Sequence, residues 1–182
     1  MRVIAFYTKD TEYEKLVPAW EESFKSCKTK IYPIENLGSW EENCAMKPKV
    51  LLEALLEFDD HLLYVDIDAE LCRPLPFIPV PNVPGFSFLD KFKPKPFNRQ
   101  LASGTIYLPQ TVPTYKIVLE WLHFQQANPK MWDQMSLQHI VENMMHSYQV
   151  LPPEWCGISI HQELEDPIIY HNQASRRLKK TV

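Results

Sequence analysis

The stretch HLLYVDIDAEL, residues 61–71, places two aspartates directly behind a short apolar run. The run HLLYV has the length and the branched and aromatic side chains of a buried strand. Asp66 and Asp68 follow with one residue between them, and residues i and i+2 of an extended chain point to the same side. Two carboxylates so placed repel each other unless a cation or hydrogen-bond donors offset the charge. Either one aspartate caps a turn and the other is solvated, or the pair holds a divalent cation bound to phosphate oxygens.

Outside this stretch, apolar strand patterns alternate with amphipathic helix patterns. Strands are predicted at residues 2–8, 30–34, 61–65, 85–89, 103–109, 148–152 and 168–171. Helices are predicted at residues 11–26, 47–58, 114–126 and 133–145, the first bent or shortened by Pro18. The alternation predicts an α/β domain with a largely parallel sheet. Ligands of such sheets bind beyond the carboxyl ends of the strands, where Asp66 and Asp68 are expected to lie.

Composition favours a single soluble domain spanning residues 1–182. Nucleic-acid binding usually needs a basic face, and the net charge of -4 argues against one, so nucleic-acid binding is not expected. The four cysteines form no CxxC pair, so a zinc knuckle is not expected. Their even number would allow two disulfides, but a chain this large and apolar does not need them, which favours free thiols in a reducing compartment. The apolar run near the N-terminus is too short for a signal peptide or a membrane span. A cytoplasmic protein without a transmembrane segment is therefore expected.

Seven segments together resemble one known class of enzyme, in the same order along the chain. They are VIAFYT (3–8), ENCAMKPKVLLEAL (42–55), LLYVDIDAEL (62–71), LASGTIYLP (101–109), MWDQMSLQHIV (131–141), LPPEWC (151–156) and IIYHNQASRRLKK (168–180). The class is the GT-A type of nucleotide-sugar-dependent glycosyltransferase, in particular its small members with a D-x-D motif and a late histidine. The resemblance implies a Rossmann-like mixed sheet, mostly parallel and flanked by helices.

The resemblance also implies a metal site. Asp66, Asp68 and His171 would hold a divalent cation, Mn²⁺ or Mg²⁺, and the imidazole tilts the choice toward Mn²⁺. Such a cation bridges the two phosphates of the donor and stabilises the departing nucleoside diphosphate as a Lewis acid.

The donor site follows from the same resemblance. The residues expected to contact the nucleotide-sugar are Tyr7, Thr8, Lys47, Asp66, Ser103, Gly104, Arg176 and Lys179. Asp133 and Gln134 are the expected catalytic pair, Asp133 holding sugar hydroxyls near the reacting carbon and Gln134 lying at the reacting face. Asp133 is also expected to cap the helix that follows it. Ala174 departs from the related pattern, which often has a glycine there, so Arg176 or Arg177 would take the basic role.

The expected function is transfer of a sugar from a UDP- or GDP-sugar to a hydroxyl of a glycan, glycolipid or protein acceptor. The late histidine and the DQ pattern favour retention of configuration. One alternative is a haloacid-dehalogenase-type phosphatase, in which Asp66 would be the nucleophile and Asp68 the acid and base. A sugar-nucleotide pyrophosphorylase would need a glycine-rich N-terminal loop, which is missing here. A further alternative is a non-catalytic module that binds a nucleotide-sugar.

Overall fold

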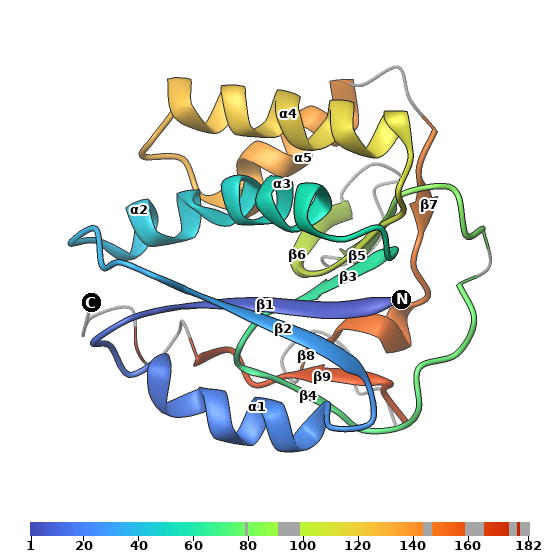
Figure 1. Ribbon diagram of the computed structural model, residues 1–182. Helices are drawn as coiled ribbons and strands as arrows, with labels where there is room; N and C mark the ends of the chain where they lie inside the picture. The colour runs from blue at the N-terminus through green and yellow to red at the C-terminus, as the bar shows by residue number, and fades with distance from the viewer. Residues whose placement is uncertain (79, 91–98, 144–146, 159–165, 175–177, 179–182) are drawn as a thin grey trace.

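Strands from both halves of the chain meet in one central six-stranded sheet (Figure 1). The computed structural model describes residues 1–78, 80–90, 99–143, 147–158, 166–174 and 178, and the statements below concern these residues. In spatial order the strands are β2 (Lys28–Ile34), β1 (Arg2–Thr8), β3 (Leu62–Val65), β6 (Arg99–Leu108), β5 (Gly85–Asp90) and β7 (Gln149–Val150). β1 pairs in parallel with β2 and β3, and β7 pairs in parallel with β5. β6 runs antiparallel to β3 and β5, so the predicted mixed, mostly parallel sheet is confirmed.

A second, three-stranded sheet lies below the first in Figure 1. Its strands, in spatial order, are β4 (Ala69–Leu71), β9 (Ile169–His171) and β8 (Gly157–Ile158). The helices are α1 (Val17–Ser23), α2 (Trp40–Ala45), α3 (Lys47–Glu57), α4 (Val112–Ala127) and α5 (Asp133–Asn143), with 3₁₀ turns η1 (Glu14–Leu16) and η2 (Pro153–Cys156). Among the described residues, no helix is both long and apolar enough to cross a membrane. The four cysteines, all described, are unpaired, as expected.

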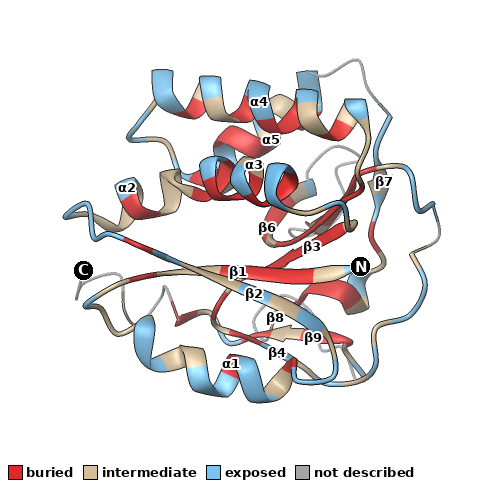
Figure 2. Cartoon of the chain, in the orientation of Figure 1, coloured by how far each residue is buried: buried red, intermediate tan, exposed pale blue. Residues whose placement is uncertain are grey.

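Both faces of the central sheet are covered, which explains why β3 is buried at every residue (Figure 2). Leu62 and Tyr64 pack with α3, α4 and α5 on one face. Leu63 and Val65 pack with α1 and the second sheet on the other. A strand covered on both sides reads as a continuous apolar run, which is the pattern in HLLYV. β3 is therefore rigidly held at its end, directly before Asp66.

One predicted helix differs from the observed one, and some observed elements were not predicted. The helix predicted over residues 11–26 is a 3₁₀ turn followed by the short helix α1. Pro18 is the second residue of α1, where its missing N–H has no helical partner to lose, so it begins this helix instead of bending a longer one. The strand β4 was not predicted, because three residues form it only by pairing with the distant β9.

Candidate active site

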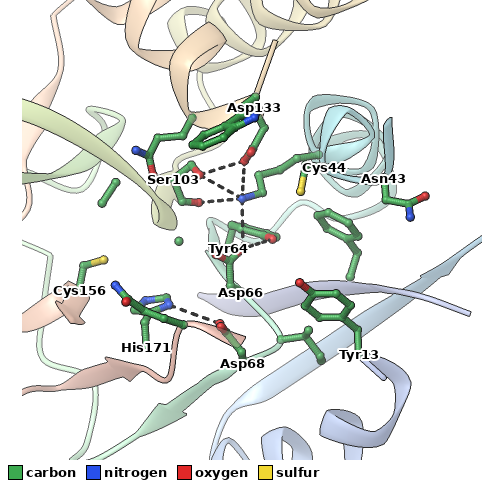
Figure 3. A pocket seen from close by; sticks show the side chains of 18 of the residues that line it. Tyr13, Asn43, Cys44, Tyr64, Asp66, Asp68, Ser103, Asp133, Cys156 and His171 are labelled. Carbon is green, nitrogen blue, oxygen red and sulfur yellow. Dashed lines mark hydrogen bonds and ion pairs between the residues drawn. The ribbon is translucent and has the colours of Figure 1, made fainter. Parts of the chain in front are cut away.

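A cavity of about 500 Å³ opens where β1 and β3 end (Figure 3). It brings together ten of the residues singled out from the sequence: Tyr7, Thr8, Lys47, Asp66, Asp68, Ser103, Gly104, Asp133, Gln134 and His171. Arg176 and Lys179 lie outside the described residues. The cavity wall therefore combines segments from the first strand to the last.

Asp66 is the first residue after β3, and its position is fixed through backbone and side chain. Its amide N donates to the carbonyl of Gly104 at 2.9 Å, which continues the pairing between β3 and β6. Its Oδ1 accepts from the Tyr64 hydroxyl at 2.6 Å and from the Lys47 ammonium at 3.1 Å. Both bonds use the same oxygen, which leaves Oδ2 for another partner.

Asp68 lies across the cavity floor from Asp66 and is nearly buried. Its Oδ2 accepts from the backbone N–H of Ala174 at 2.6 Å. Its Oδ1 lies 3.9 Å from Nδ1 of His171, too far for a hydrogen bond. Burial raises the pKa of Asp68, but His171 and the Ala174 N–H lower it more, so the net pKa lies below the ordinary value. Asp68 is therefore a carboxylate at neutral pH.

His171 reaches the same floor from β9, where it pairs with Ala69 across the small sheet. Its side chain is buried, and Nε2 lies 2.8 Å from Oγ1 of Thr105. When Nε2 carries the proton and donates to this hydroxyl, Nδ1 presents a lone pair toward Asp68. In that tautomer Nδ1 is the nitrogen of His171 that is available to a cation.

Asp66, Asp68 and His171 form a possible metal site. One ligand atom from each lies within 4.8 Å of the other two, close enough for a single divalent cation to reach all three. Gly104 packs against two of these side chains, since a Cβ there would lie 2.7 Å from Cε1 of His171 and 3.1 Å from Oδ2 of Asp66. Two carboxylates and an imidazole are ligands suited to Mn²⁺ or a similar ion. The residues present therefore fit the cation that the sequence implies.

Lys47 is buried beneath the cavity and joins two carboxylates. Its ammonium lies 2.7 Å from Oδ2 of Asp133 and 3.1 Å from Oδ1 of Asp66, and it also donates to the carbonyl of Ser103 at 3.2 Å. Burial lowers the pKa of Lys47, but the charges of Asp133 and Asp66 raise it more, so Lys47 stays protonated. Lys47 is the only lysine or arginine among the described residues that line the cavity. The three carboxylates of Asp66, Asp68 and Asp133 carry more negative charge than the single Lys47 ammonium balances, and a bound cation would balance the remainder.

Asp133 begins α5 with its side chain turned inward rather than over the helix end. The expected role of Asp133 as the N-cap of α5 is wrong, because Asp133 is already the first helical residue. The first helical hydrogen bond runs from the Ser136 N–H to the carbonyl of Trp132 at 3.0 Å, so Trp132 holds the cap position. The carboxylate instead accepts from the Ser103 hydroxyl at 2.9 Å and pairs with Lys47. Gln134, the next residue, is half-buried and lines the cavity.

Several residues of the site were not predicted from the sequence. Tyr64 lies two residues before Asp66 on an extended chain, so the same-side rule could have found it. Thr105 lies two residues after Ser103 and could have been found in the same way. Gln173 also lines the cavity. No local signal marks Gln173, because its place depends on the hydrogen bonds that its neighbours Asn172 and Ala174 make to Asp68.

The sequence model of one protein family, described as nucleotide-diphospho-sugar transferase, matches residues 38–164, more than half of the chain. A search of curated proteins found no match. Among solved structures, one described as a glycosyltransferase involved in the glycosylation of the major capsid of PBCV-1 matches with a TM-score of 0.74. It has 14% sequence identity, covering 99% of this chain and 97% of that chain, so the likeness concerns the fold.

Proposed function

The chain belongs to the nucleotide-diphospho-sugar transferase family and is a GT-A-type glycosyltransferase, and we propose that it is metal-dependent and uses a UDP- or GDP-sugar as donor. The observation that carries this proposal is the grouping of Asp66, Asp68 and His171 in the cavity that also holds Asp133 and Gln134. A bound Mn²⁺ or Mg²⁺ would supply Lewis-acid stabilisation of the diphosphate leaving group. Asp66 would offer Oδ2 to the cation, because Lys47 and Tyr64 occupy Oδ1.

The protein's own groups would bind and orient the sugar. Asp133, held by Lys47 and Ser103, would accept hydrogen bonds from sugar hydroxyls and fix the reacting carbon. Gln134 follows Asp133 on the first turn of α5 and would lie at the reacting face. Gly104 lies against Asp66 and His171 at the proposed cation site, where its backbone can approach the donor closely, and Ser103 beside it lines the same cavity.

The nucleotide would extend from the cation toward the end of β1. Tyr7 and Thr8 line that end of the cavity and would contact the ribose or the base. Arg176 and Lys179 would add positive charge to the diphosphate. We propose transfer to a hydroxyl of a glycan, glycolipid or protein with retention of configuration. The four unpaired cysteines support a cytoplasmic location.

Family membership argues against the phosphatase alternative, and the missing glycine-rich N-terminal loop argues against a pyrophosphorylase. The remaining alternative is a member of the family that binds the donor without transferring it. The test is calorimetric titration of UDP and GDP with and without Mn²⁺, on the wild type, on Asp68→Asn and on Asp59→Asn. Asp59 is an exposed aspartate outside the cavity and serves as the control.

We expect Mn²⁺-dependent binding of one nucleotide, lost in Asp68→Asn and retained in Asp59→Asn. Incubation with the matching nucleotide-sugar should then release nucleoside diphosphate in the wild type, by transfer or slow hydrolysis. Binding without any release would favour the non-catalytic module. Failure of both nucleotides to bind under any metal condition would overturn the proposed donor site.

A further inference from the structure

Gln173 has a backbone conformation that glutamine rarely adopts. Its φ is 51°, in the left-handed region where a Cβ crowds the following carbonyl. Asp10, with φ of 57°, is the only other non-glycine residue with positive φ in the described part of the chain. Asp tolerates this region better than Gln does, because its short side chain bonds locally. The conformation at Gln173 therefore needs a compensating interaction.

Hydrogen bonds on either side of Gln173 explain the turn of its backbone. The backbone N–H and the side-chain amide of Asn172 donate to the carbonyl of Asp68 at 3.2 and 3.1 Å. The N–H of Ala174 then donates to Oδ2 of the same aspartate at 2.6 Å. The chain must reverse at Gln173 to make both contacts. A glycine would allow this reversal without strain, so the turn does not explain why a glutamine side chain is present.

The side chain of Gln173 has one polar atom without a partner among the described residues. It lines the cavity beside Asp68 and His171. Its Oε1 is buried, and none of the described residues donates a hydrogen bond to it. Buried polar atoms are nearly always paired, and backbone strain gathers at sites that bind ligands. An unpaired acceptor on a strained residue in the cavity wall therefore points to a donor group on the ligand.

We propose that Oε1 of Gln173 accepts a hydrogen bond from a hydroxyl of the nucleotide-sugar donor. This inference rests on the proposed function, because it assumes that the donor occupies the cavity. The diphosphate beside Asp68 would bring only acceptor oxygens, which cannot satisfy another acceptor. The hydroxyls of the ribose and of the transferred sugar flank the diphosphate and can donate. Gln173 is thus a residue that recognises the donor.

Two variants separate the side chain from the backbone. Gln173→Met keeps the length and the strain but removes the amide, and Gln173→Gly removes both amide and strain. Each is titrated by calorimetry, in the presence of Mn²⁺, with UDP, GDP and their glucose esters. We expect both variants to weaken binding about five- to tenfold. Weaker binding of the nucleoside diphosphate itself assigns the partner to the ribose, and weaker binding of the glucose ester alone assigns it to the sugar.

Thermal unfolding supplies a second readout that a purely structural residue would not give. Gln173→Gly should raise Tm by about 1–4 °C while it weakens binding. The free energy gained by relieving the backbone strain exceeds the free energy lost because glycine makes the unfolded chain more flexible. Asp10→Gly is the control, since it also replaces a residue of positive φ by glycine, but outside the cavity. It should raise Tm less than Gln173→Gly does, because Asp tolerates this conformation better, and it should leave nucleotide affinity unchanged.

The outcomes distinguish a failure of this inference from a failure of the proposed function on which it rests. If the wild type binds a nucleotide and both Gln173 variants match its affinity, the inference is overturned and the proposed donor site stands. A lowered Tm in Gln173→Gly would likewise contradict it, by showing that the side chain stabilises the free protein. If the wild type binds no nucleotide under any metal condition, both the proposed function and the inference fail.

Discussion

At the scale of single residues, Lys47 has the greatest electrostatic consequence. It is buried between Asp133 and Asp66, and its charge offsets two carboxylates that would otherwise repel each other. Its removal would leave the buried charge of Asp133 without a counter-ion. Breaking a buried ion pair in this way costs about 3–5 kcal/mol. The lysine is therefore expected to stabilise the fold and to position Asp133 as well.

We predict that Lys47→Met lowers the free energy of unfolding by about 3–5 kcal/mol, measured by urea denaturation. The matched control is Lys30→Met, because Lys30 pairs with Glu57 at 3.6 Å and both side chains are more than two-fifths exposed. An exposed pair contributes less than about 1 kcal/mol. Equal losses in the two variants would contradict the buried role of Lys47.

Residues also show what the sequence alone can reveal. Asp66 and Asp68 could be identified because their signal is local, an apolar strand followed by two carboxylates. Lys47 was expected to contact the donor, since one lysine in a sequence gives no sign of burial. Its partners Asp66 and Asp133 lie far along the chain, and only the fold brings them together. The role of each residue toward the donor stays a prediction.

At the scale of elements, α4 and α5 are joined by a buried polar cluster beneath Asp133. The Ser136 hydroxyl accepts from Nε1 of Trp121 at 2.8 Å, contacts Oε1 of Gln125 and lies 2.9 Å from the carbonyl of Asp133. Trp121, Gln125 and Ser136 are all buried. The cluster fixes the start of α5 against α4, and with it the backbone that carries Asp133 and Gln134.

We predict that Ser136→Ala destabilises the protein by about 1–3 kcal/mol, because the Trp121 N–H and the Gln125 oxygen lose a buried partner. Denaturant unfolding measures the effect, and Ser26→Ala, at an exposed serine, should change stability by less than about 0.5 kcal/mol. A Ser136→Ala variant as stable as the wild type would show that the cluster relaxes without cost.

Elements with a strong internal period were predictable, and those defined by pairing were not. The helix predicted over 47–58 appears as α3, because its apolar residues repeat at helical spacing. β4 and β8 hold three and two residues, too few to show any period. They exist because β9 pairs with both of them. The small sheet that positions His171 is therefore a product of long-range contacts.

At the scale of the whole molecule, ligand binding and folding should be coupled. The cavity joins residues from β1, β3, β6, α3, α5 and β9, so a ligand bound there holds most of the described fold together. A ligand at 100 times its Kd, binding only the folded state, stabilises it by about 2.7 kcal/mol. For a chain of this size that corresponds to roughly 5–10 °C in Tm.

We predict this rise in Tm when Mn²⁺ and the matching nucleoside diphosphate are added together, measured by scanning calorimetry. Removing the metal with EDTA should return Tm to the value of the free protein. Asp68→Asn should show little or no rise under the same conditions. A nucleotide that raises Tm equally in EDTA would indicate a site that does not use the cation.

The hydrogen bond from Ala174 to Asp68 joins residues 106 positions apart, so Asp68 is made well before its partner during synthesis. Ribosomes add about 5–20 residues each second, so roughly 5–20 seconds pass between the synthesis of Asp68 and the synthesis of its partners on β9 and in the turn after it. During that interval the emerging chain has its two aspartates but lacks His171 and Ala174. The cluster of Asp66, Asp68 and His171 can form only after the last strand has been made. A nascent chain is therefore expected to be inert toward the cation until nearly all of the fold is present.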